Sequence, residues 1–298
     1  MANSWLGRYL AVGVIWGGSF LFIALGNQAL TPTGVGFWRM LLGGAPLLIW
    51  ALIKRIPWPT EPITWAKLFF VSLCMNSIPS VLFSYAEQHV SSGFAGIINA
   101  MTPITTLLMI LLIFREETPK PVVLIGLGVG LVGALLVLGV WNGFGQNDPL
   151  AVGALILAVT FYGVGGPFAR RYVTPLGIDV RLQVPLQVML AAVTLTPFYL
   201  SGPLFTATPS WPAILGMLTL GALGTGLAYI WYYQLMALAG SAIANSVTYL
   251  SPAVAVLAGS LLLRETIQWN EILGGIVVIL GAAISQGRFA KWLPQKLK

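Results

Sequence analysis

Apolar residues occur along this chain in long blocks separated by short segments rich in Pro, Gly, Asn and charge. A helix needs roughly 20 apolar residues to cross the hydrocarbon core of a membrane. Polar breaks such as 54–62 and 141–149 divide the blocks at about this length. The pattern predicts ten transmembrane helices, at 6–26, 33–53, 65–86, 91–114, 121–140, 149–170, 177–200, 211–236, 241–263 and 269–288.

Composition supports an all-α integral membrane protein. The chain is 57% hydrophobic and 8% charged, whereas soluble domains carry about 25% charged residues. Leu182–Leu263 contains no Asp, Glu, Lys or Arg. Because the chain has one histidine, one cysteine (Cys74) and no His-Glu-x-x-His motif, we expect no cofactor, no metal site and no enzymatic activity.

The positive charges predict an orientation. With the N-terminus inside, nearly all basic residues fall on the cytoplasmic side, as the positive-inside rule requires. We therefore expect a multi-pass protein of the bacterial plasma (inner) membrane with both termini cytoplasmic. The first apolar run is too long for the core of a cleavable signal peptide. Nucleic-acid binding is disfavoured because the charges are dispersed over Arg8, Lys54, Arg55, Lys67, Arg115, Lys120, Arg170, Arg171, Arg181, Arg288, Lys291, Lys296 and Lys298.

The chain is also an internal duplication. Two motifs recur at a spacing of 149 residues, half of the 298-residue length. We predict one repeat at 1–147 and a second at 148–298, each with five helices. Because five is odd, the second repeat enters the membrane from the opposite side, and such inverted repeats are typical of transporters with a site between the halves. The matching pairs are Arg115-Glu116 with Arg264-Glu265 and Thr102-Pro103 with Ser251-Pro252.

These features resemble the drug/metabolite transporter superfamily, in its ten-helix EamA-type branch. The resemblance covers nearly the whole chain and implies export of small organic metabolites. Within the branch, the chain is most similar to bacterial exporters of aromatic and other neutral amino acids. The resemblance to the EamA-type branch rests on the paired prolines, the Arg-Glu pairs, the glycine-rich helices 121–140 and 269–288, and the run Trp16-Gly17-Gly18-Ser19-Phe20.

Two prolines lie near the middle of their helices. Proline lacks an amide hydrogen and clashes with the carbonyl four residues earlier, so Pro103 frees the carbonyl of Asn99 and Pro252 that of Thr248. An unpaired carbonyl is costly in hydrocarbon. We expect the two breaks to act as hinges beside a solute site; a plain kink satisfied by a Ser or Thr hydroxyl is the alternative.

Polar and aromatic side chains deep in the spans predict the site itself. In helix 65–86, Ser72, Asn76, Ser80 and Ser84 are four apart and share one face. We expect Asn76, and Asn245 in helix 241–263, to face a wet cavity, and most serines to serve helix packing. Deep aromatic rings offer an apolar wall with a polar edge. The predicted solute-binding residues are Trp16, Asn76, Ser80, Tyr85, Asn99, Tyr162, Tyr229, Tyr233, Asn245 and Tyr249, with Pro103 and Pro252 as hinges.

Charges near the spans refine this expectation. No Asp or Glu lies near the centre of a span, which disfavours antiport of cationic drugs and proton coupling in general. Arg39, about two turns into helix 33–53, is expected to snorkel outward, with carboxylate binding as the alternative. Glu87 and His89 are expected to be solvated at the outer end, with a gate role as the alternative.

The sequence thus predicts a secondary transporter that exports neutral, especially aromatic, amino acids or similar small metabolites by alternating access through a central cavity. Transport of another small solute, such as a nucleobase, a sugar derivative or a lipophilic drug, is the alternative. A rigid pore is disfavoured by the paired hinges. The expected partners are the solute and the lipid bilayer, in a monomer or weak homodimer.

Overall fold

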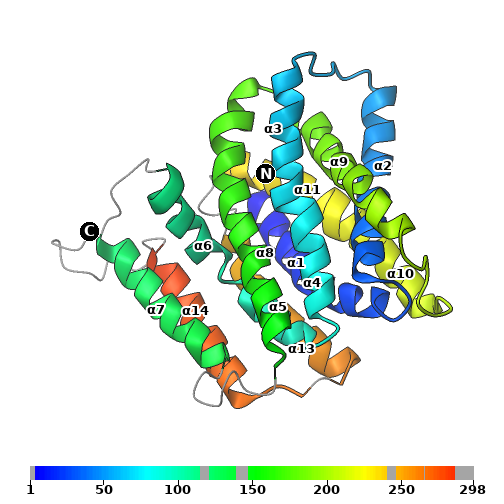
Figure 1. The fold of residues 1–298 in the computed structure, drawn as a ribbon. Coiled ribbons are helices and arrows are strands. Elements are labelled where there is room, and N and C mark those ends of the chain that lie inside the picture. The colour runs from blue at the N-terminus through cyan, green and yellow to red at the C-terminus, as the bar shows by residue number, and fades with distance from the viewer. Residues whose placement is uncertain (1–3, 115–120, 139–146, 240–245, 265, 286–298) are drawn as a thin grey trace.

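A computed structural model describes residues 4–114, 121–138, 147–239, 246–264 and 266–285 (Figure 1). Within these ranges the chain forms helices and no strand. Seven of the described helical segments are long and apolar enough to cross a membrane, and two shorter apolar helices accompany them. The prediction of an all-α membrane fold is confirmed, while the count of ten spans stays a prediction.

The helices follow the predicted blocks closely. The first half contains α1 (Ser4–Gly26), α2 (Pro32–Ile53), α3 (Pro62–Ser72), the π-helix η1 (Leu73–Ser77), α4 (Ile78–Ala86), α5 (Ser92–Asn99), α6 (Thr102–Met109), the π-helix η2 (Ile110–Phe114) and α7 (Pro121–Leu138). The second half contains α8 (Pro149–Phe168), the π-helix η4 (Ala169–Val173), the short 3-10 helix η5 (Thr174–Leu176), α9 (Val180–Leu200), α10 (Trp211–Thr219), the π-helix η6 (Leu220–Leu227), α11 (Ala228–Ala239), the 3-10 helix η7 (Ser246–Tyr249), α13 (Leu250–Leu262) and α14 (Trp269–Ser285).

Side-chain caps explain where several helices begin. The Thr31 hydroxyl accepts a hydrogen bond from the Gly34 amide, and α2 starts there. Two predicted starts differ by three residues: the helix expected from 65 begins at Pro62, and the helix expected from 177 begins at Val180. Gly177 has a φ of 66°, which ends the preceding turn, and the Asp179 carboxylate then caps α9.

The helix contacts that the first half makes with the second half recur when each helix is replaced by its equivalent in the other half. Helix α1 packs on α13 as α8 packs on α6, and α2 packs on η6 as α9 packs on η1. Pairs of equivalent helices, such as α7 and α14, lie side by side (Figure 1). The pair is antiparallel, because Gly133 lies beside Val278 whereas Gly130 lies beside Gly281. An inverted repeat requires such antiparallel pairs; the boundary between 147 and 148 stays a prediction.

Two π-helices interrupt equivalent spans, and the sequence pattern did not predict them. Moved by the repeat distance of 149 residues, the segment 73–77 of η1 falls on 222–226, inside η6. A π-helix bonds each amide five residues back, which widens the turn and is common at functional sites. Both turns are supported by a hydroxyl: Ser77 donates to the Ser72 carbonyl at 3.4 Å, and Thr225 donates to the Leu220 carbonyl at 3.3 Å.

Candidate functional site: a central cavity

A cavity of about 220 Å³ lies between the two halves. Pockets for drug-sized ligands occupy roughly 300–1,000 Å³, so this one suits a small metabolite. Both halves contribute to its wall, through α1, α2, α4, α5, α6 and α8 as well as η1, η2, η4, α11 and η7. It is lined by Trp16, Ser19, Phe20, Ile23, Arg39, Met75, Phe83, Asn99, Thr102, Pro103, Thr106, Ile110, Tyr162, Gly166, Pro167, Arg170, Tyr229, Tyr232 and Thr248.

Aromatic rings close one end of the cavity. The ring centroids of Phe20 and Phe83 are 5.7 Å apart, and those of Phe83 and Tyr162 are 6.1 Å apart. Beyond these rings, α1 and α4 are joined by two hydrogen bonds. The Asn27 side-chain amide donates to the Ser84 carbonyl at 2.8 Å, and the Ser84 hydroxyl donates to Asn27 Oδ1 at 2.6 Å. From these contacts we infer that the cavity is closed toward the end of the molecule where α1 finishes.

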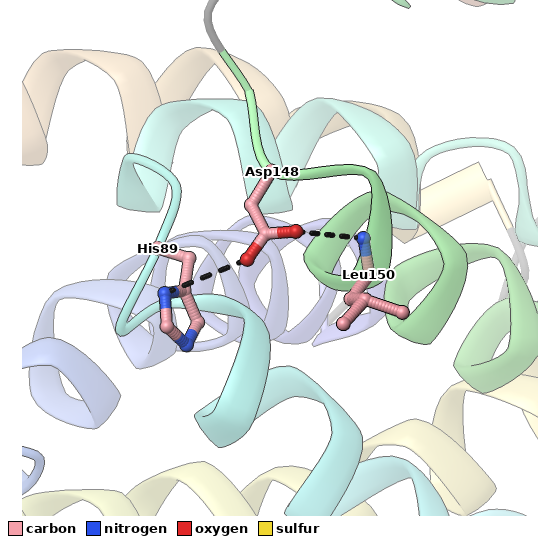
Figure 2. Close-up of polar contacts among 3 residues, drawn as sticks. All are labelled: His89, Asp148 and Leu150. Carbon is pink, nitrogen blue, oxygen red and sulfur yellow. Dashed lines mark hydrogen bonds and ion pairs between the residues drawn. The ribbon is translucent and has the colours of Figure 1, made fainter.

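A second contact at the same end joins the two halves (Figure 2). The Nδ1 atom of His89, after α4, lies 3.7 Å from Oδ2 of Asp148. The other carboxylate oxygen of Asp148 accepts a hydrogen bond of 2.8 Å from the Leu150 amide and caps α8. His89 and Asp148 are 40% and 34% exposed. The turn between α4 and α5 is thereby held to the start of α8.

The opposite end of the cavity reaches the surface. Ile110 and Gly166 line the wall there, and the exposed side chain of Arg170 stands at its mouth. Because Arg170 follows α8 at the end predicted to be cytoplasmic, the mouth would face the cytoplasm in the orientation predicted from charge.

Trp16 and Tyr229 line the cavity, but their polar edges are already bonded. Trp16 Nε1 donates to the Gly224 carbonyl in η6 at 3.1 Å. The Tyr229 hydroxyl donates to the Met75 carbonyl in η1 at 3.2 Å. These two rings therefore present apolar faces to the cavity, and their polar atoms support the π-helices. The expected polar edge toward the solute is not found at these two residues.

Arg39 reaches the cavity, so the expectation that it snorkels outward is wrong. Its Nε donates to Thr225 Oγ1 at 3.0 Å, and the side chain lines the cavity. The approach of α2 to η6 makes this possible. A Cβ added to Gly43 would lie only 2.7 Å from the Gly221 carbonyl oxygen, so only glycine allows the two backbones so close.

The break at Pro103 takes the form of a satisfied kink. Helix α5 ends at Asn99 and α6 begins at Thr102. The Thr102 hydroxyl donates to the Asn99 carbonyl at 2.7 Å, which is the alternative that the sequence left open. Asn99 and Pro103 both line the cavity. A hinge at Pro103 stays a prediction.

The equivalent break in the second half is only partly described. The 3-10 helix η7 passes into α13 at Leu250, shortly before Pro252. Asn245 lies outside the described residues, as do the side chains of Tyr249 and Pro252. Their predicted roles stay predictions, as does the hinge.

Four predicted solute-binding residues do not line the cavity: Asn76, Ser80, Tyr85 and Tyr233. Asn76 and Ser80 are 3% and 2% exposed and lie between helices. The Tyr85 ring lies 5.1 Å from the His89 ring at the closed end. Tyr233 packs against the hydrophobic cluster that Met40 of α2 forms with residues of α9. Of the ten predicted residues, the structure brings Trp16, Asn99, Tyr162 and Tyr229 together around one space.

Different neighbours along helix 65–86 explain why its polar residues do not gather at one cavity. Helix α3 packs on α9, whereas α4 packs on α8, α2 and α1. Ser72 consequently donates to the Gln187 carbonyl of α9 at 2.7 Å, whereas Ser84 bonds Asn27 at the end of α1. The two serines therefore bond different helices, and the packing role expected for them is what the structure shows.

Arg39 is the site residue that sequence reasoning undervalued. The signal was present, because an arginine inside an apolar span is costly and such residues usually mark a functional site. Among the described residues, no three His, Cys, Asp or Glu side chains gather into a group suited to a metal.

Comparisons with known proteins agree along nearly the whole chain. The model of the EamA-like transporter family matches residues 4–139 and 149–286. The "Uncharacterized inner membrane transporter YedA" of Escherichia coli (strain K12) is 27% identical over 95% of this chain and 91% of its own length. The "Uncharacterized transporter YoaV" of Bacillus subtilis (strain 168) is 23% identical over 95% and 96%. A solved structure titled "Crystal structure of protein" aligns over 99% of this chain and 100% of its own, with a TM-score of 0.68 and 16% identity, and shows the fold.

Proposed function

Since the chain belongs to the EamA-like transporter family, we propose that it exports neutral, especially aromatic, amino acids or similar small metabolites across the bacterial inner membrane by alternating access. The observation that carries this proposal is the cavity of about 220 Å³ between the halves, walled by Trp16, Tyr162 and Tyr229. Aromatic walls of this kind suit a small solute with an apolar or aromatic body.

The closed and open ends support a carrier. Rings and hydrogen bonds close the cavity where α1 ends, while its mouth reaches the surface at Arg170. A carrier that works by alternating access exposes its site to one side at a time. In the predicted orientation, the structure corresponds to the state that loads solute from the cytoplasm.

Flux measurements test the proposal. Purified protein in proteoliposomes should exchange a radiolabelled aromatic amino acid in a saturable way and show counterflow, which a rigid pore does not. Competition by unlabelled nucleobases, sugar derivatives and lipophilic drugs would identify another solute class. No acidic residue lines the cavity among the residues described, so we expect flux without a pH gradient. Strict dependence on that gradient would overturn the uncoupled mechanism.

Two glycines of α8 offer a matched pair of variants. A Cβ built on Gly166 or on Gly153 meets no atom within 4 Å, but only Gly166 lines the cavity. Gly166→Trp should fill the cavity and abolish counterflow, while Gly153→Trp should transport normally. Both variants should fold, because the Cβ of each new side chain meets open space. Normal counterflow in Gly166→Trp would show that solute does not pass through this cavity.

A further inference from the structure

The guanidinium of Arg39 lies at the cavity, and no described residue provides a counter-charge for it. Its Nε donates to Thr225 Oγ1 at 3.0 Å, and among the described residues no other hydrogen bond or ion pair holds it. An arginine carries five N–H donors in a planar fork. One donor is bonded to Thr225, so the two terminal nitrogens are left for another partner. A charge at this depth is costly unless it is paired or hydrated.

Its position relative to the rings places the charge inside the site. Arg39 lines the same cavity as Tyr162 and Tyr229. Thr225, which holds the guanidinium, belongs to η6, whose Gly224 carbonyl binds Trp16. A planar acceptor bound at Arg39 would therefore lie next to the aromatic wall.

The duplication did not copy this residue. Shifting Arg39 by 149 positions leads to Val188, and Leu182–Leu263 contains no charged residue. Thr225, by contrast, has a polar counterpart, Asn76. A residue that only supported the shared scaffold would be needed in both halves. The charge is present in one half alone, which favours a role toward a solute bound once in the molecule.

The positive charge of the cavity lining selects for the charge of the solute. Among the described lining residues the charged ones are Arg39 and Arg170, both positive. We propose that Arg39 binds a carboxylate of the solute and that the cavity thereby accepts aromatic monocarboxylates with a net negative charge. The inference rests on the proposed transport function and narrows its solute, from neutral amino acids to similar metabolites that carry a carboxylate without an ammonium. In an α-amino acid the ammonium is next to the carboxylate, so it would lie near Arg39 with no acidic side chain of the described lining to pair with it.

Three ligands of one shape test the proposal on the full-length protein. Phenylalanine is zwitterionic, 3-phenylpropionate lacks the ammonium, and phenethylamine lacks the carboxylate. Binding is measured by calorimetry at neutral pH. We expect 3-phenylpropionate to bind at least as tightly as phenylalanine, and phenethylamine to bind at least about tenfold more weakly, since a charge-assisted pair contributes that much or more.

Variants assign the preference to Arg39. Arg39→Gln should remove the preference for the acid, and Arg39→Lys, which keeps the charge but loses the fork, should retain part of it. Arg181→Gln is the matched control, because Arg181 is 63% exposed and lies outside the lining. If Arg39→Gln fails to fold, Arg39→Lys and the wild-type ligand series still decide the question.

The outcomes separate the two proposals. Equal binding of all three ligands by the wild-type protein, or an unchanged preference in Arg39→Gln, would overturn the carboxylate site while leaving transport of aromatic solutes intact. Much tighter binding of phenylalanine than of 3-phenylpropionate would overturn the preference for net-negative solutes. A wild-type protein that binds none of the three would overturn both proposals.

Discussion

The hydrogen bond from Tyr229 to the Met75 carbonyl joins the two interrupted spans of the two halves, and its removal should loosen the described conformation. The hydroxyl donates at 3.2 Å from α11 to η1. Tyr229→Phe removes this oxygen and leaves the ring in place. A neutral hydrogen bond contributes about 0.5–1.5 kcal/mol, so the ratio of this conformation to competing ones should fall roughly two- to tenfold.

Thermal unfolding measures the loss. For chains of this size 1 kcal/mol corresponds to roughly 2–4 °C, so the apparent melting temperature of purified Tyr229→Phe should fall by about 1–6 °C at a fixed scan rate. Tyr233→Phe is the matched control. It makes the same change one helical turn away, at a hydroxyl that makes no hydrogen bond to any residue the structure describes.

The comparison of the two variants decides the matter. A Tyr229→Phe protein as stable as the wild type would refute the argument that this contact holds the halves together. So would an equal loss in Tyr233→Phe, because the effect would then come from removing any tyrosine hydroxyl in this region. Counterflow assays should also show altered transport in Tyr229→Phe alone.

Three further predictions concern packing, the closed end and the helix break. Gly17→Ala should lower the free energy of unfolding by about 1–3 kcal/mol, because its Cβ would lie 2.8 Å from a backbone carbonyl of α13. Gly18→Ala should leave stability unchanged, because the nearest atom to its Cβ would be 3.8 Å away, and thermal unfolding compares the two variants. Asp148→Ala should lower the free energy of unfolding by about 1 kcal/mol more than Asp148→Asn, because asparagine keeps the helix cap. His89→Ala should lower it by at most about 1 kcal/mol. Equal losses of stability in the two Asp148 variants would contradict the capping role. Pro103→Ala should slow counterflow while ligand binding stays intact, since an amide there competes for the Asn99 carbonyl; an unchanged rate would argue against a hinge.

Much of the fold was readable from the chain itself. Blocks of apolar residues have the length of a membrane span, so they predicted the helices from α1 to α14 within a few residues. The recurrence of Thr102-Pro103 as Ser251-Pro252 located the breaks after Asn99 and before Leu250. Depth in a span also identified Trp16, Tyr162 and Tyr229 as residues of a common space. All of these follow from local composition and periodicity.

The details of the site depend on contacts between distant residues, which periodicity does not contain. Ser72 bonds α9 whereas Ser84 bonds α1, and no local pattern indicates which neighbouring helix each serine meets. Whether Arg39 points outward or inward depends on how close Gly43 lets α2 come to η6. Hydrophobic patterning specifies which segments enter the bilayer, whereas the packing of helices against one another sets where each side chain points.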